Sequence, residues 1–365
     1  MEEKRRQYGP DALRILAILF VFLLHTMGLG GITPSTERLS LNYSIAWIME
    51  IIAYCAVDCF VLLAGYFGYS QKTRYAHLVN LWIEAAFYSV AITLFFAVWH
   101  GNFSPAALLK AFFPLTTAPF WYFSAYFGMY LLTPFLNAAI RSMGKKETVS
   151  SLAVLLLFFT TIPCLNSTIF GLEHGYSVLW FCVVYFVGAA LRKYEADAAV
   201  SSKKLVLGIL LSVFVTWFSK LLAEAFFIYV LGKNTGAGLL VRYLSPTILF
   251  TAVCFLLLFL RWRPGEKTCQ IIRFLTPSVF GQYLIQDHPL IRTNAISERF
   301  TQLASESPLS MIVWILVIVV LSFLLCLCVD LLRRLLFLPL HIPRKLNKLE
   351  NTIRHRLSRP TAEKR

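Results

Sequence analysis

The feature that most constrains this chain is a succession of apolar segments long enough to cross a lipid bilayer. A transmembrane helix needs about 20 predominantly apolar residues, and the sequence contains ten candidate segments. Hydrophobic residues make up 58% of the 365-residue chain and charged residues only 15%, whereas soluble domains carry about 25% charged residues. The sequence therefore predicts an all-α, polytopic membrane protein and excludes a soluble globular enzyme and a disordered chain. The predicted spans cover approximately residues 11–30, 44–67, 78–99, 120–140, 149–162, 177–191, 205–231, 243–260, 271–285 and 309–332.

The positions of the basic residues predict how these spans are oriented. The chain has 34 Lys and Arg against 19 Asp and Glu, which gives a net charge of +15. If the N-terminus is cytoplasmic, most of these cations fall in the inner segments, as the positive-inside rule requires. Both termini are therefore predicted to be cytoplasmic, and no nucleic-acid partner is needed to explain the charge. The exceptions are Arg38, Lys110, Lys233, Arg242, Arg292 and Arg299 in outer loops, and Arg14 and Lys220 within spans.

The predicted organisation has three parts. Residues 1–10 form a cytoplasmic N-terminal segment, residues 11–332 form the transmembrane domain, and residues 333–365 form a basic cytoplasmic tail along the anionic inner leaflet. The first apolar run contains Arg14 and His25 and ends without a small-residue cleavage site, so we expect it to remain as a transmembrane helix. The eight cysteines are scattered, and no His or Cys cluster has metal-ligand spacing. We therefore expect neither a disulfide framework nor a metal site.

Ionisable residues within the spans are the first candidates for function, because each is costly unless it faces the interior of the bundle. Arg14 and His25 are eleven residues apart, so an α-helix places both on one face, with His25 about 16 Å farther into the membrane. Asp11 lies on nearly the same face and can pair with Arg14. A snorkelling arginine and a structural histidine are the alternative interpretation. The other candidates are Glu50, Asp58, Glu84, Lys220 and Glu224, with Asp287 and His288 at the outer end of the ninth span.

Several candidate residues have structural explanations that compete with a functional role. Lys220 and Glu224 stand four residues apart, and this spacing favours a neutralising ion pair within one helix over a substrate contact. Asp58 lies within an apolar run and needs a partner. Trp121 and Tyr122 begin the fourth span and are typical either of an aromatic belt at the interface or of a binding site.

Five segments, taken together, resemble acyltransferase family 3. The segment from Asp11 to His25 resembles the opening signature of that family, an arginine followed by ten residues and a histidine. Two positions depart from the family pattern. Ala64 stands where the family usually has serine, and Gln286 stands where relatives commonly have histidine, with an asparagine near the position of His288. The other similar segments follow in the family's order at residues 58–67, 120–137, 176–194 and 280–289.

The resemblance implies a membrane O-acetyltransferase that moves an acetyl group from cytoplasmic acetyl-CoA to a hydroxyl of an envelope glycan or lipid-linked saccharide. Such enzymes lie in the bacterial cytoplasmic membrane, with acetyl-CoA as a substrate and no permanently bound cofactor. We expect Arg14, Lys72 and Arg74 to bind the phosphates of acetyl-CoA. His25 is expected to act as general base on the acceptor hydroxyl. Direct transfer is preferred over an acyl-histidine intermediate.

A buried carboxylate is expected to orient the imidazole of His25. Asp58 ranks slightly ahead of Glu84 for this role, so Asp58 is the catalytic candidate beside His25. Supporting or acceptor-side roles are expected for Asp11, Glu84, Trp121, Tyr122, Gln286, Asp287 and His288.

Two other functions remain open from the sequence. A transporter or flippase for a glycan or small solute would use the intramembrane charges as substrate or proton-coupling groups. The sequence shows no repeated pairs of Gly- or Pro-broken helices, which argues against it. A regulator that keeps the fold without catalysis is suggested only by Ala64 and Gln286. Binding or hydrolysis of acetyl-CoA distinguishes the enzyme from the transporter.

Overall fold

The computed structural model of the chain describes residues 6–357, except 197–199, 234–237 and 239. All regular elements in these residues are helical, which confirms the predicted all-α class. The helices of the first half are α1 (Tyr8–Leu24), α2 (Ile32–Ser35), α3 (Leu41–Tyr54), α4 (Ala56–Gly68), α5 (Tyr75–Trp99), α6 (Pro105–Ala111), α7 (Trp121–Ser142) and α8 (Lys145–Leu156). Those of the second half are α9 (Val178–Lys193), α10 (Ser202–Tyr229), α11 (Pro246–Arg261), α12 (Glu266–Leu275), α13 (Val279–Gln286), α14 (Pro289–Ile291), α15 (Pro308–Phe337) and α16 (Ile342–Leu357).

Seven helical stretches of the described chain are long and apolar enough to cross a membrane, or eight if a bent pair counts as one span. The bent pair joins Ile169–Gly175 to α9 at an angle of 78°. The chain is therefore a multi-pass membrane protein, and the count of ten stays a prediction. The seven stretches are Tyr8–Ser35, Leu41–Gly68, Tyr75–Trp99, Trp121–Ser142, Lys145–Cys164, Ser202–Tyr229 and Pro308–Phe337.

The segment predicted as the ninth span, residues 271–285, is not one continuous α-helix. It is divided into the end of α12, a 3-10 turn at Thr276–Ser278 and most of α13. Pro277 lies in this turn, where its missing N–H and ring interrupt an α-helical hydrogen-bond ladder. The interruption brings α13 against α1, α5 and α15 rather than extending α12.

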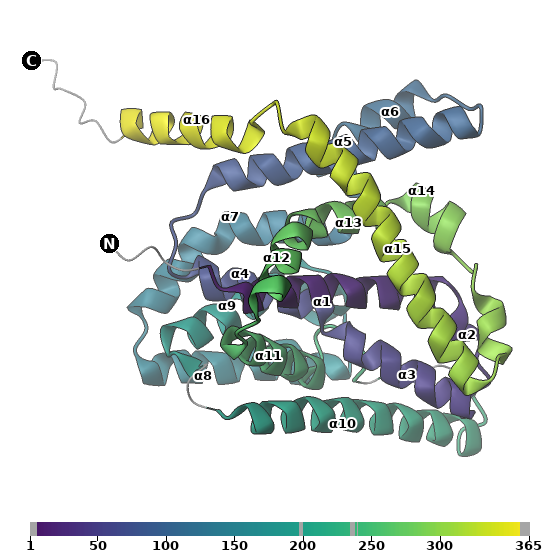
Figure 1. Ribbon diagram of the computed structural model, residues 1–365. Helices are drawn as coiled ribbons and strands as arrows, with labels where there is room; N and C mark the ends of the chain where they lie inside the picture. Colours follow the sequence, from purple (N-terminus) through teal and green to yellow (C-terminus); the bar gives the residue numbers. More distant parts are fainter. Residues whose placement is uncertain (1–5, 197–199, 234–237, 239, 358–365) are drawn as a thin grey trace, which may run out of the picture.

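Helix α1 runs through the middle of the bundle and contacts α3, α4, α11 and α15 (Figure 1). Close packing beside it depends on two glycines where α4 crosses α9. A Cβ at Gly65 would lie 2.2 Å from the backbone oxygen of Tyr185, and one at Gly188 would lie 2.3 Å from that of Leu62. Small residues thus allow these two backbones to approach as membrane helices often do.

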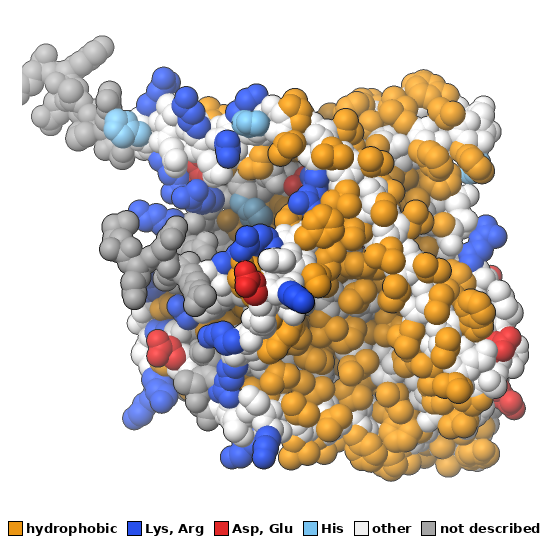
Figure 2. All heavy atoms as spheres, viewed as in Figure 1, with side chains coloured by type: hydrophobic (Ala, Val, Ile, Leu, Met, Phe, Trp, Pro, Cys, Tyr) orange, Lys and Arg blue, Asp and Glu red, His pale blue; other side chains and the backbone are white. Residues whose placement is uncertain are grey.

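The surface of the molecule separates charge from apolar side chains. Figure 2 shows Lys and Arg gathered at the end that carries both termini, while hydrophobic side chains cover most of the remaining visible face. Exposed apolar residues on the long helices account for this cover and suit contact with lipid tails. They include Phe95, Phe135, Leu210, Phe214, Leu321 and Leu325.

Helix α15 continues past residue 332, where the sequence suggests that the transmembrane domain ends. Arg333 is buried, and its Nε donates to Asp330 Oδ1 at 2.8 Å while its Nη1 lies 3.6 Å from Glu84 Oε2. Tyr88 also donates to Asp330 Oδ1, at 2.6 Å. The predicted tail therefore begins inside this helix, and its first basic residue belongs to the bundle. The second helix of the tail, α16, lies beside the start of α5 (Figure 1).

Candidate functional site

Two adjoining cavities lie along α1. The first has a volume of about 640 Å³ and is lined by residues from Arg14 to Leu29, together with side chains of α3, α7 and α13. The second has a volume of about 830 Å³ and opens beside the charged end of the bundle. Both are lined by Arg14, Ala64, His77, Asn80 and Tyr126, so they meet at the inner part of α1.

Arg14 stands where the two cavities meet. Its Nη1 lies 2.7 Å from Asp11 Oδ1, and Arg6 Nη2 lies 2.7 Å from the other oxygen of the same carboxylate. The predicted pairing of Asp11 with Arg14 is confirmed. Because Asp11 neutralises only one of the two cations, the cluster keeps a net positive charge toward the second cavity.

His25 lies at the other end of the first cavity, one residue after the regular part of α1. The expectation that Arg14 and His25 share a face is confirmed, because both side chains line this cavity. His25 begins a π-helical turn that ends at Leu29, a distortion often found at functional sites. The turn closes through a 2.8 Å hydrogen bond from Gly30 N to His25 O, and Gly31 then adopts a φ of +86°.

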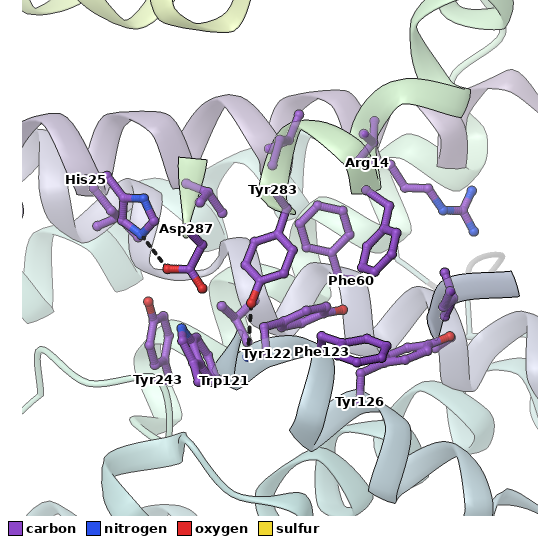
Figure 3. A pocket seen from close by; sticks show the side chains of 18 of the residues that line it. Arg14, His25, Phe60, Trp121, Tyr122, Phe123, Tyr126, Tyr243, Tyr283 and Asp287 are labelled. Carbon is purple, nitrogen blue, oxygen red and sulfur yellow. Dashed lines mark hydrogen bonds and ion pairs between the residues drawn. The ribbon is translucent and has the colours of Figure 1, made fainter. Parts of the chain in front are cut away.

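The carboxylate nearest to the His25 ring belongs to Asp287. His25 faces Asp287 (Figure 3), with Nε2 and Asp287 Oδ1 4.0 Å apart. The side chain of Asp287 is only 1% exposed. Arg292 Nη1 lies 3.5 Å from the same carboxylate oxygen. Among the described residues, His25 Nδ1 has no hydrogen-bond partner. The site therefore joins an imidazole, a buried acid and an arginine, and the ring nitrogen Nδ1 is itself buried.

The two acids expected to orient His25 have other partners. Asp58 is fully buried, does not line either cavity, and accepts a 3.1 Å hydrogen bond from Trp180 Nε1. Glu84 lines the first cavity, where it accepts from Asn80 Nδ2 at 2.9 Å and lies near Arg333. The structure thus brings neither Asp58 nor Glu84 to the imidazole as it does Asp287. Hydropathy alone did not distinguish these acids, since all three lie in or beside apolar segments.

The remaining predicted residues are divided between the cavities and their surroundings. Lys72 and Arg74, in the loop before α5, line the second cavity together with Arg192. Trp121 and Tyr122 line the first cavity, which favours a binding role over an aromatic belt alone.

The structure separates two further candidates of the chain's second half. Gln286 is buried and neighbours the His25 ring. His288 does not line the cavity: its Nδ1 accepts from Leu290 N at 3.2 Å and caps α14.

An aromatic cluster at the His25 end of the cavity was only partly identified from the sequence. The rings of Trp121 and Tyr176 are 4.4 Å apart, those of Trp121 and Tyr243 are stacked at 5.8 Å, and Tyr54 lies 5.4 Å from Tyr243. All four residues line the cavity. The sequence does not indicate Tyr54 and Tyr243, because isolated tyrosines in apolar segments carry no pattern of their own.

The predicted pair of Lys220 and Glu224 is confirmed, with Nζ 2.9 Å from Oε2. Arg38 Nη1 also lies 3.0 Å from Glu224 Oε1, and Lys220 Nζ lies 4.5 Å from the centre of the Trp47 ring. None of these four residues lines the first cavity. Lys220 and Glu224 neutralise each other within one helix, so the structural interpretation holds.

A helical bundle with lipid-facing apolar helices and an internal cavity lined by aromatic and ionisable side chains defines a multi-pass membrane protein with a reaction or binding site inside the bundle. Residues 7–331 match acyltransferase family 3, described as an acyltransferase domain. The chain therefore belongs to this family and is a membrane acyltransferase. No curated protein and no solved structure matches the chain.

Proposed function

We propose that the protein is an O-acetyltransferase of the bacterial cytoplasmic membrane, which moves acetyl from acetyl-CoA to a hydroxyl of an envelope glycan or lipid-linked saccharide. The observation that carries this proposal is the pair of adjoining cavities. One has a basic opening, and the other ends where His25 faces Asp287. Acetyl-CoA carries its negative charge on its phosphates and none on its acyl arm. The basic opening therefore suits the phosphates, and the cavity that ends at His25 suits the arm.

Acetyl-CoA enters from the cytoplasm and binds with its phosphates at the basic opening. Lys72, Arg74 and Arg192 line that opening, and charge-assisted hydrogen bonds from such groups suit phosphate oxygens. The charged end with both termini then faces the cytoplasm, as the positive-inside rule predicts. The pantetheine arm passes Arg14 and carries the thioester along α1 toward His25, a rise of about 16 Å.

His25 acts as general base on the acceptor hydroxyl. The imidazole takes the hydroxyl proton at a ring nitrogen that carries no proton, while Asp287 faces Nε2. The acceptor oxygen forms a bond to the acetyl carbonyl carbon, and the carbon–sulfur bond of the thioester breaks. The CoA thiolate leaves with the electron pair and receives the proton from the imidazolium. Asp287 positions the ring and stabilises its transient positive charge.

The acceptor binds beyond His25, against the aromatic cluster of Tyr54, Trp121, Tyr176 and Tyr243. Flat aromatic faces suit the apolar faces of sugar rings, and the phenol hydroxyls supply hydrogen-bonding groups. This cluster supports a saccharide over an acceptor that is wholly apolar.

The test is His25→Ala, assayed in membranes by transfer of labelled acetyl from acetyl-CoA to alkali-labile ester. We expect loss of transfer with normal expression and with CoA binding retained, because His25 lies away from the basic opening. His100→Ala is the matched control, since His100 is exposed after the end of α5. Full transfer by His25→Ala refutes the mechanism. A wild-type protein that neither binds CoA nor cleaves acetyl-CoA refutes the enzymatic proposal and favours a transporter.

A further inference from the structure

The C-terminal helix α16 lies outside residues 7–331, the part of the chain that defines the family. It is nevertheless fixed to the donor side of the bundle by polar contacts. Glu350 accepts from the backbone N–H groups of Tyr75 and Ala76, each at 3.2 Å. Arg354 donates to the backbone oxygen of Thr73. These contacts join α16 to the first turn of α5 and to the loop before it, where a carboxylate also favours the helix N-terminus.

The same docking brings one face of α16 to the opening of the second cavity. Pro343 and Asn347 line this cavity, and Asn347 Oδ1 accepts from Arg74 Nη1 at 3.4 Å. Arg344 and Lys348 flank Asn347 on the helix, and the three residues together line a shallow depression on α16. The α16 residues that line the opening itself, Pro343 and Asn347, are uncharged, and the cations Arg344 and Lys348 lie next to them along the helix.

The donor has a part that fits this extension. CoA carries its negative charge at one end, in the 5′-diphosphate and the 3′-phosphate of the adenosine, while the acyl end is uncharged. If the thioester reaches His25, the adenosine end remains at or outside the opening, beside α16. Arginine and lysine side chains there suit the phosphates, and an asparagine amide can pair with the adenine edge.

We propose that Arg344, Asn347 and Lys348 of α16 form the outer part of the donor site and bind the 3′-phosphorylated adenosine end of CoA. This inference rests on the proposed use of acetyl-CoA. It assigns recognition of the nucleotide to a helix that follows the family domain, whereas the acyl arm is bound by the domain itself. An exposed, basic α16 that is docked by Glu350 and Arg354 then has a function besides contact with the inner leaflet.

The test compares ligands that share the acyl arm and differ at the nucleotide. The full-length protein is placed in nanodiscs of phosphatidylcholine alone, and its affinity is measured for CoA, 3′-dephospho-CoA and 4′-phosphopantetheine. We expect Arg344→Ala and Lys348→Ala each to weaken CoA binding about tenfold, which corresponds to about 1.4 kcal/mol. Binding of 4′-phosphopantetheine should be unchanged. Glu350→Ala, which removes the hydrogen bonds from α16 to the start of α5 and keeps Arg344 and Lys348, should weaken CoA binding in the same selective way.

Lys345→Ala is the matched control, because Lys345 is an exposed cation of α16 that lines neither the cavity nor the depression. Thermal unfolding of each variant verifies that the bundle is intact. If wild-type protein binds CoA but Arg344→Ala and Lys348→Ala behave like Lys345→Ala, the assignment to α16 is wrong while the proposed function stands. If Arg344→Ala and Lys348→Ala change binding only in nanodiscs that contain anionic lipid, the assignment to α16 is also overturned, because these cations then bind a lipid headgroup. If the wild-type protein binds none of the three ligands, it has no donor site for CoA and the proposed function is wrong as well.

Discussion

The substitution Asp287→Asn tests the central geometry of the site most directly. His25 Nε2 and Asp287 Oδ1 are 4.0 Å apart, with Asp287 almost fully buried. In the transition state the imidazole becomes a cation, and two unit charges at this separation interact by about 4 kcal/mol at an effective dielectric constant of about 20. Each 1.36 kcal/mol is worth a factor of ten in rate, so the full interaction amounts to about a thousandfold.

Arg292 reduces this figure, because its guanidinium lies 3.5 Å from the same carboxylate oxygen and offsets part of the negative charge. We therefore expect Asp287→Asn to lower the rate of acetyl transfer by about 10²- to 10³-fold. Binding of CoA should not change, since Asp287 does not line the basic cavity. The assay is single-turnover transfer of labelled acetyl in proteoliposomes, with CoA affinity measured on the same preparation.

Asp58→Asn is the informative comparison. Its amide oxygen can still accept the hydrogen bond that Trp180 donates to Asp58, so the structure predicts nearly normal transfer. The sequence-based interpretation, in which Asp58 orients His25, predicts the opposite order of the two variants. A large loss in Asp58→Asn together with normal transfer in Asp287→Asn refutes the assignment of Asp287.

Two further predictions concern packing and docking. Gly65→Ala places a Cβ 2.2 Å from the Tyr185 backbone oxygen, and such overpacking costs about 1–3 kcal/mol, so Tm should fall by about 5 °C. Gly265→Ala is the control, because its added Cβ meets nothing within 4 Å. Equal Tm values for the two variants would contradict the packing argument. Burial raises the pKa of Glu350, but hydrogen bonds from a neighbouring guanidinium and two backbone N–H groups outweigh it, so its pKa is lowered from 4.5. The contribution of Glu350 to the docking of α16 is therefore fully present above pH 4.5 and is lost as the pH falls through the lowered value. Spin labels on α16 and α5 should move apart during acidification, and a constant distance would exclude this role of Glu350.

Features that depend on neighbours along the chain were predictable. Helical periodicity placed Arg14 and His25 on one face, and both side chains line one cavity. The spacing of Lys220 and Glu224 predicted their ion pair. Hydropathy predicted the all-α membrane fold, because each apolar segment must satisfy its own backbone hydrogen bonds in lipid. It did not reveal that the segment around Pro277 is interrupted, since a hydropathy average does not register a local break.

The sequence by itself determined the class of fold, the gathering of basic residues at one end of the bundle and the alignment of Arg14 with His25. All three follow from local periodicity and from the cost of charge in lipid. Only the tertiary structure decided which acid faces the imidazole. Asp58, Glu84 and Asp287 are equivalent as buried carboxylates in a sequence, but the packing of α13 against α1 brings only Asp287 to His25. The docking of α16 at the basic opening is likewise a contact between distant segments, which no local pattern encodes.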